Sequence, residues 1–200
     1  MKGLKSISLI MLLVLTVVFG SYSITFADDC DYIVNEVAAL LDFSEDGITS
    51  NYSYSIANDM SEEMASVIVQ IKPPADMSIE DLNFTDSRSG NALTYTEQEG
   101  QKYLVGLDTP VGAGESFVLN ITANIKIQEA YGKKFKVGIT IPAVCGSVKM
   151  LQEPDSFQLT VRMPEDWDIS SSFPTVYPTD SADVNEAFVS LTNVPGLFQA

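Results

Sequence analysis

The feature that most restricts the fold of this chain is a strict alternation of side chains over residues 116–127. Every second residue there is apolar, namely Phe117, Leu119, Ile121, Ala123, Ile125 and Ile127. The intervening positions include Asn120, Thr122 and Asn124. Successive side chains of a β-strand point to opposite faces, so a period of two indicates a strand with one dry and one wet face. The segment is therefore predicted to be a half-buried strand.

Shorter segments repeat this pattern between clusters of turn-forming residues, such as residues 44–47 and 86–91. The further expected strands are residues 34–43, 48–56, 65–71, 79–84, 92–96, 102–107, 135–141, 144–151, 157–163 and 187–194. No segment combines helix caps with several helical turns. About nine to eleven strands at this spacing predict an all-β chain. The expected architecture is an antiparallel two-sheet β-sandwich of the immunoglobulin-like class, because one-sided strands hide their dry faces by stacking two sheets.

The first 27 residues have the pattern of a secretory signal peptide. Lys2 and Lys5 precede an apolar run over residues 7–19, and small residues flank a cleavage point after Ala27. We expect a signal peptide over 1–27, a single β-sandwich domain over 28–200 and a secreted, extracytoplasmic product. An uncleaved membrane anchor is the alternative, but the run is shorter than the roughly 20 residues of a bilayer span. No second apolar segment is long enough to span a membrane in the mature chain. A second small domain starting near Pro142 is the alternative to a single domain.

Cys30 and Cys145 are the two cysteines of the chain. In an oxidising compartment an even pair of cysteines usually forms a disulfide. We therefore expect Cys30 and Cys145 to be bonded, with two free buried thiols as the alternative.

The chain is acidic and contains no histidine. It has 11 basic and 27 acidic residues, which gives a net charge of −16. This charge disfavours nucleic acid and anionic lipid as partners. The absence of histidine removes the Ser-His-Asp and Cys-His catalytic arrangements and most zinc hydrolases. A non-enzymatic chain without a cofactor is expected. The rival is a glycosidase-like envelope hydrolase that uses the carboxylates of Glu165, Asp166 and Asp168 beside Trp167.

Two acidic turns, and the group of Asp28, Asp29 and Asp31, are candidates for calcium, which prefers several oxygen ligands from loops. One contains Asp42 and Asp46, and the other contains Asp180, Asp183 and Glu186. Neither has the spacing of a helix-loop-helix calcium site, so solvated turns are the favoured interpretation.

Three Asn-x-Ser/Thr triplets begin at Asn51, Asn83 and Asn120, and each is a glycosylation acceptor in a host that modifies secreted chains. The outward positions of the alternating pattern include Asn120. The chain is also rich in tyrosine, with 8 residues. We favour cross-strand packing for these rings over a surface platform for sugar or protein.

Taken together, these features favour a secreted, non-catalytic β-sandwich module for extracellular or cell-surface binding or assembly. The expected partner is an extracellular protein or glycan. The carboxylate-based hydrolase and a self-assembling structural subunit are the alternatives.

The first prediction concerns processing of the chain. Protein collected outside the cytoplasm should begin at Asp28 and be lighter than its reduced form by two hydrogen atoms, because the signal peptide is removed and Cys30 bonds Cys145. Intact-mass spectrometry before and after reduction measures both. A chain that retains residues 1–27, or a mass that reduction leaves unchanged, contradicts the prediction.

Overall fold

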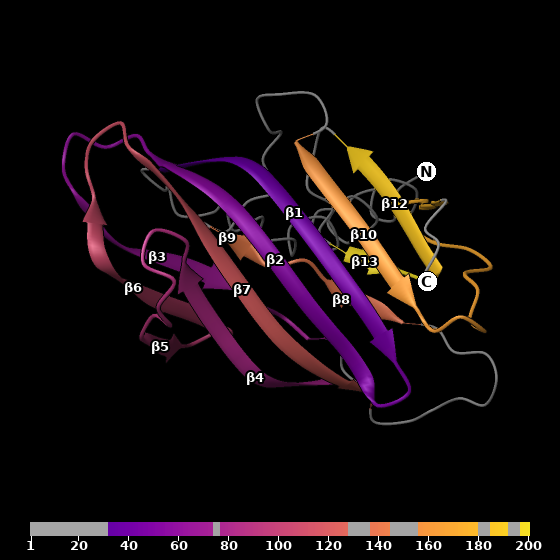
Figure 1. The fold of residues 1–200 in the computed structure, drawn as a ribbon. Helices are drawn as coiled ribbons and strands as arrows, with labels where there is room; N and C mark the ends of the chain where they lie inside the picture. Colours follow the sequence, from indigo (N-terminus) through magenta and orange to yellow (C-terminus); the bar gives the residue numbers. More distant parts are fainter. Residues whose placement is uncertain (1–31, 74–76, 128–136, 145–155, 180–184, 192–196) are drawn as a thin grey trace, which may run out of the picture.

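The computed structural model describes residues 32–73, 77–127, 137–144, 156–179, 185–191 and 197–200. Within these residues the chain forms 13 strands and no helix, so the expected all-β class is confirmed. None of the described segments is a helix long and apolar enough to cross a lipid bilayer. The strands are arranged in three sheets (Figure 1).

The large sheet has seven strands in the order β11-β12-β10-β1-β2-β7-β4. Their bounds are β1 (Tyr32–Ser44), β2 (Gly47–Asn58), β4 (Met77–Asp86), β7 (Ser116–Ile127), β10 (Phe157–Met163), β11 (Tyr177–Pro178) and β12 (Asn185–Leu191). A four-stranded sheet has the order β5-β6-β3-β9, and a two-stranded sheet pairs β13 with β8. These strands are β3 (Met64–Gln70), β5 (Tyr95–Gln98), β6 (Lys102–Val111), β8 (Gly138–Thr140), β9 (Ala143–Val144) and β13 (Leu197–Gln199). In the view of Figure 1 the strands of the two smaller sheets lie behind the large sheet.

The alternating pattern locates several strands well. Strands β7 and β10 have the bounds expected from the sequence. Strand β6 continues through Pro110 to Val111, whereas the expected strand ended at residue 107. The short strands β11 and β13 were not expected, because two or three residues are too few to show a period.

One strand pair differs from the antiparallel arrangement that we expected. Strands β1 and β10 are parallel, in a register that runs from Val37 opposite Phe157 to Asp42 opposite Arg162. The other strand pairs of the described residues are antiparallel. Parallel neighbours need a long crossover rather than a hairpin. Here the crossover from β1 to β10 contains all the strands from β2 to β9. The alternation of side chains within one strand does not show which other strand lies beside it, so this pairing was not expected.

One continuous apolar cluster lies between the sheets, and its members come from all three. Its fully buried residues include Leu41, Ile121 and Leu159 of the large sheet, Val69 and Val105 of the four-stranded sheet, and Ile139 and Phe198 of the two-stranded sheet. Burying one face of each sheet in this way is the main stabilising contribution, at roughly 25 cal/mol per Å² of apolar surface.

The turn between β1 and β2 requires glycine at position 47. Gly47 has a φ of +151°, and a Cβ there would lie 2.4 Å from the carbonyl oxygen of Ile125. The turn is two residues long, because Ser44 pairs with Gly47 across it. This tight turn sets the register of β1 on β2, which the outer face of the large sheet depends on.

Two buried tyrosines connect the large sheet to the strands behind it. The Tyr54 hydroxyl donates to the carbonyl oxygen of Pro142 at 2.6 Å. The Ile68 N–H donates to the Tyr32 hydroxyl at 3.1 Å, and that hydroxyl donates to the Ile68 carbonyl at 3.4 Å. Burial, and secondarily the charge interaction with Tyr52, raises the pKa of Tyr54 well above 10.0. Packing rather than surface display is therefore the role of Tyr32, Tyr52 and Tyr54.

The second prediction tests the hydrogen bond of Tyr54. Tyr54→Phe should lower the free energy of unfolding by about 1–2 kcal/mol, because the carbonyl of Pro142 then loses its buried donor. Tyr95→Phe is the matched control, since the Tyr95 ring is 43% exposed. Urea denaturation at pH 7 measures both variants. Equal stabilities of the two variants would show that the Tyr54 bond contributes nothing.

Candidate binding site on the outer face of the large sheet

The side chains that point away from the core form cross-strand rows on the large sheet. One row consists of Asn83, Thr122, Asn51, Leu40, Thr160 and Phe188. The adjoining row consists of Thr85, Asn120, Ser53, Ala38, Gln158 and Ser190. We call these 12 residues the uncharged face, because none of them is acidic or basic.

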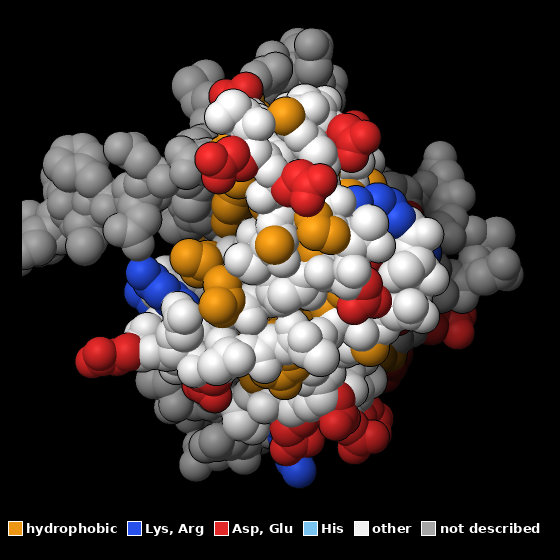
Figure 2. Space-filling view, turned by 90° about the vertical axis from the view of Figure 1, so that its left-hand side faces the viewer, with side chains coloured by type: hydrophobic (Ala, Val, Ile, Leu, Met, Phe, Trp, Pro, Cys, Tyr) orange, Lys and Arg blue, Asp and Glu red, His pale blue; other side chains and the backbone are white. Residues whose placement is uncertain are grey.

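The uncharged face contrasts with the rest of the surface. The next row along the sheet contains Asp42, Arg162 and Glu186. Figure 2 shows acidic side chains scattered over the end of the molecule that lies at the left of Figure 1. For a chain with a net charge of −16, two adjoining rows without a charge are a local departure from the overall composition.

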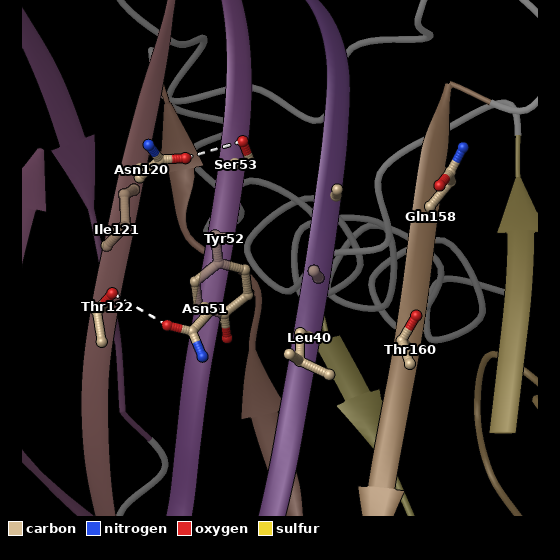
Figure 3. A pocket seen from close by; sticks show the side chains of 11 residues that line it. Leu40, Asn51, Tyr52, Ser53, Asn120, Ile121, Thr122, Gln158 and Thr160 are labelled. Carbon is tan, nitrogen blue, oxygen red and sulfur yellow. Dashed lines mark hydrogen bonds between the residues drawn. The ribbon is translucent and has the colours of Figure 1, made fainter. Parts of the chain in front are cut away.

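Hydrogen bonds between β2 and β7 fix the middle of the uncharged face (Figure 3). The Ser53 hydroxyl donates to Oδ1 of Asn120 at 2.9 Å. In the other row, the Thr122 hydroxyl donates to Oδ1 of Asn51 at 3.0 Å. Within the described residues, the side-chain nitrogens of Asn51 and Asn120 make no further protein hydrogen bond. These two amides are therefore held in place by their oxygens while their N–H groups remain available.

The three Asn-x-Ser/Thr triplets meet on this face. They lie in the neighbouring strands β4, β7 and β2, with β7 in the middle. Thr122 of β7 pairs with Asn83 of β4 on one side and with Asn51 of β2 on the other. Antiparallel pairing places the Asn of one triplet opposite the Ser or Thr of the next, which is the pairing that hydrogen-bonds well across strands. Asn83 is exposed on the edge strand, whereas Asn51 and Asn120 are half-buried. For the triplets at Asn51 and Asn120, cross-strand bonding is thus a physical reason for the pattern that is independent of glycosylation.

A shallow hollow of about 330 Å³ lies over these rows (Figure 3). Ala38 and Leu40 of β1 line it between Asn51 and Ser53 of β2 on one side and Gln158 and Thr160 of β10 on the other. A second hollow of about 140 Å³ adjoins it and shares Ala38, Ser53 and Gln158. The small side chain of Ala38 leaves the space that joins them.

Sequence reasoning identified the asparagines of this face but missed the residues of β1 and β10. Leu40, Gln158 and Thr160 occupy outward positions of strands that the alternation located. The absence of charged residues at those outward positions could have indicated that they belong to the same surface. The sequence did not predict that β1 and β10 are neighbours, because they pair in parallel and are far apart in the sequence.

Of the calcium candidates, Asp42, Asp46 and Glu186 lie within the described residues. Asp42 and Asp46 are exposed. The Glu186 carboxylate accepts a hydrogen bond from Nε of Arg162 at 3.0 Å. Asp180 and Asp183, like Cys30 and Cys145, lie outside the described residues. Across the part of the chain that is described, no three Asp, Glu, Cys or His side chains are grouped to hold a metal ion.

The carboxylates proposed for a hydrolase surround a turn rather than a pocket. Glu165, Asp166 and Asp168 are exposed, and the half-buried Trp167 between them packs against the core. The Trp167 N–H donates to the carbonyl of Pro164 at 3.0 Å, which closes the turn. Trp167 therefore anchors a connection to the core, and its acidic neighbours face solvent.

The buried carboxylate of the described structure belongs to a structural ion pair. The Asp86 side chain is 1% exposed and contacts Nη2 of Arg88 at 2.6 Å. Burial by itself would raise the pKa of Asp86, but the hydrogen bonds from Arg88 hold that pKa below its ordinary value of 3.8. Arg88 also donates to the carbonyl of Thr109 and lies over the ring of Phe117, 5.2 Å from its centre. The pair thus joins the end of β4 to β6 and β7.

Comparison with known proteins identifies a shared fold. No protein-family model matches the sequence, and no curated protein matches it as a relative. Among solved structures, an M1 zinc metallopeptidase from Deinococcus radiodurans is 12% identical, with a TM-score of 0.55. The match covers 88% of this chain and 44% of that one. A point mutant of the M1 zinc metallopeptidase from Deinococcus radiodurans is 12% identical, with a TM-score of 0.50, over 85% of this chain and 42% of that one.

A two-domain M1 zinc metallopeptidase mutant bound to L-tryptophan is 13% identical, with a TM-score of 0.50, over 85% of this chain and 43% of that one. The chain therefore spans less than half the length of these peptidase chains. At this identity the similarity establishes the fold alone.

The residues of this chain do not fit the zinc ion named for these neighbours. Zinc sites of hydrolases are built largely from histidine, and the sequence has none. The described residues also hold no group of three acidic or cysteine ligands.

The third prediction concerns the ion pair between Asp86 and Arg88. Arg88→Gln should lower the free energy of unfolding at pH 7 by about 2 kcal/mol, because a buried carboxylate then loses its partner. The folded-state pKa of Asp86 is depressed, so its stabilising contribution is present above the ordinary value and is lost as the pH falls below it. The difference between wild type and variant should therefore be smaller at pH 3 than at pH 7.

Arg162→Gln is the matched control for this prediction. It removes an arginine from a more exposed ion pair, whose side chains are 43% and 21% exposed, and should cost less than about 1 kcal/mol. Urea denaturation at both pH values measures the two variants. A loss for Arg88→Gln that is the same at pH 3 and pH 7 contradicts the assignment.

Proposed function

We propose that this chain is an exported, non-catalytic module that binds an extracellular partner through the uncharged face of its large sheet. The observation that carries the proposal is the pair of rows centred on Asn51 and Asn120, in which oxygen atoms are bonded within the protein and N–H groups are available. The signal-peptide pattern of residues 1–27 supports export.

A fixed set of donors and acceptors lowers the entropic cost of binding. The side chains of Ser53, Thr122 and the two asparagines already share hydrogen bonds, so a ligand does not have to order them. The sheet beneath these side chains keeps the hollow rigid, because the opposite face of the sheet is packed in the core. A surface that served solubility alone would carry charged side chains, as the neighbouring row with Asp42, Arg162 and Glu186 does.

The two other functions considered from the sequence have less support. A glycosidase needs two carboxylates across a cleft, and Glu165, Asp166 and Asp168 are exposed on one turn. At one edge of the large sheet, assembly would use β4, whose pairing shifts register between Glu80 and Asn83, with Asp81 in the left-handed region at φ 52°. Bulges and charges of this kind disfavour pairing with a further strand. Peptidase activity is known here only of the structural neighbours.

For the scaffold we propose a two-layer sandwich, which the single core shared by three sheets supports. The immunoglobulin-like class stays a prediction. The parallel pairing of β1 with β10 departs from the antiparallel sheets on which that expectation was based.

The fourth prediction tests the binding surface. Ala38→Arg should reduce binding of the labelled mature protein to the envelope of the producing organism at least tenfold, because Ala38 lines both hollows and an arginine side chain fills them. The fold should persist, since Ala38 is exposed. A saturation binding assay measures the effect.

Thr96→Arg supplies the matched control. It makes the same change of charge at an exposed position of β5, on a different sheet, and should bind like the wild type. Absence of saturable binding by the wild type, or equal binding by Ala38→Arg and Thr96→Arg, would refute the proposed function.

A further inference from the structure

We infer that the ligand of the uncharged face is a neutral glycan that lies along the row from Asn51 to Tyr177. This inference rests on the proposed function, because it names the ligand class of the same surface. The row runs from Asn51 through Leu40 and Thr160 to Phe188, and Tyr177 of β11 is the next register partner.

Charge favours a neutral ligand. A net charge of −16 repels anionic sugars and phosphorylated ligands at long range. A cationic ligand needs a carboxylate to pair with. Neither row of the uncharged face contains one, and the Glu36 carboxylate lines the smaller hollow alone. What remains is a ligand whose polar groups are uncharged.

The hydrogen-bonding groups of the hollow match those of sugar hydroxyls. The amide nitrogens of Asn51 and Asn120 are donors held in fixed positions. Gln158 and Thr160, from the opposite side, each offer both a donor and an acceptor. A sugar hydroxyl also donates and accepts, so it can bridge these groups across the hollow. The two sides come from β2 and β10, with Leu40 of β1 between them (Figure 3).

Apolar surface continues the same row toward the edge of the sheet. Leu40 and Phe188 are half-buried, and Tyr177 is 64% exposed. Phe188 and Tyr177 are direct register partners, so their side chains project to the same face of the sheet. An exposed ring offers an apolar body with a polar tip, which suits the C–H face of a sugar that has hydroxyls at its rim.

The geometry is less suitable for a peptide or a protein. An extended peptide binds a sheet by adding to its edge, where backbone groups are open, and a sheet face presents side chains alone. A protein interface buries about 800 Å² on each side around a largely apolar centre. The centre of this face is instead a hollow of about 330 Å³, and small-ligand sites begin at about 300 Å³.

The experiment uses the mature protein and the envelope of the producing organism in three forms: untreated, treated with protease, and oxidised with periodate, which cleaves sugar diols. A competitor is the neutral glycan fraction released from that envelope and freed of protein. We expect binding to survive protease, to be lost after periodate, and to be blocked by the competitor. Tyr177→Ala should weaken binding about three- to tenfold.

Phe173→Ala is the control for the loss of an exposed ring, because Phe173 is 65% exposed and lies outside the two rows. It should bind like the wild type. If binding is lost after protease, survives periodate and still requires Ala38, the glycan inference is overturned while the proposed function stands. Equal binding by Tyr177→Ala and wild type overturns the placement of the glycan along this row. If the untreated envelope shows no binding, the proposed function and this inference both fail.

Discussion

The structure depends on the burial of one face of the seven-stranded sheet against the two smaller sheets. That face supplies the alternate apolar residues of β1, β2, β7 and β10. Because the side-chain period of a strand is two, fixing the inner set also fixes which residues face outward. The hydroxyls of Tyr32 and Tyr54 reach backbone partners, so these two side chains join the sheets without leaving their polar groups unsatisfied.

The outer face follows from this constraint. The outward positions 49, 51 and 53 of β2 and 120, 122 and 124 of β7 are asparagine, serine and threonine, and antiparallel pairing sets them opposite one another. Their mutual hydrogen bonds hold the amides, while β1 contributes the small Ala38 that leaves a hollow. The same sheet therefore provides stability on one side and an ordered, uncharged, hydrogen-bonding surface on the other. No charged residue of this acidic chain interrupts the two rows.

The sequence predicted most of the strands but not their partners. Alternation located β7 and β10 to the residue, and the turn at Gly47 was recognised from its composition. The parallel pairing of β1 with β10 was not predictable, since hydrophobic period and turn signals are local and this contact is not. For the same reason the three Asn-x-Ser/Thr triplets were noticed one by one, and their meeting on one face appeared only with the register of β4, β7 and β2. The ion pair of Asp86 with Arg88 escaped notice because it lies in a turn, where charged residues are usually solvated.

The most direct test of the account is NMR mapping of the mature protein, labelled with ¹⁵N, as ligand from the envelope is added. The side-chain amide resonances of Asn51, Asn120 and Gln158 should shift first and furthest, together with backbone amides of β1, β2, β7 and β10 near the hollow. Shifts concentrated instead on the four-stranded sheet, or on the exposed turn around Trp167, would contradict the claim that the uncharged face is the binding surface.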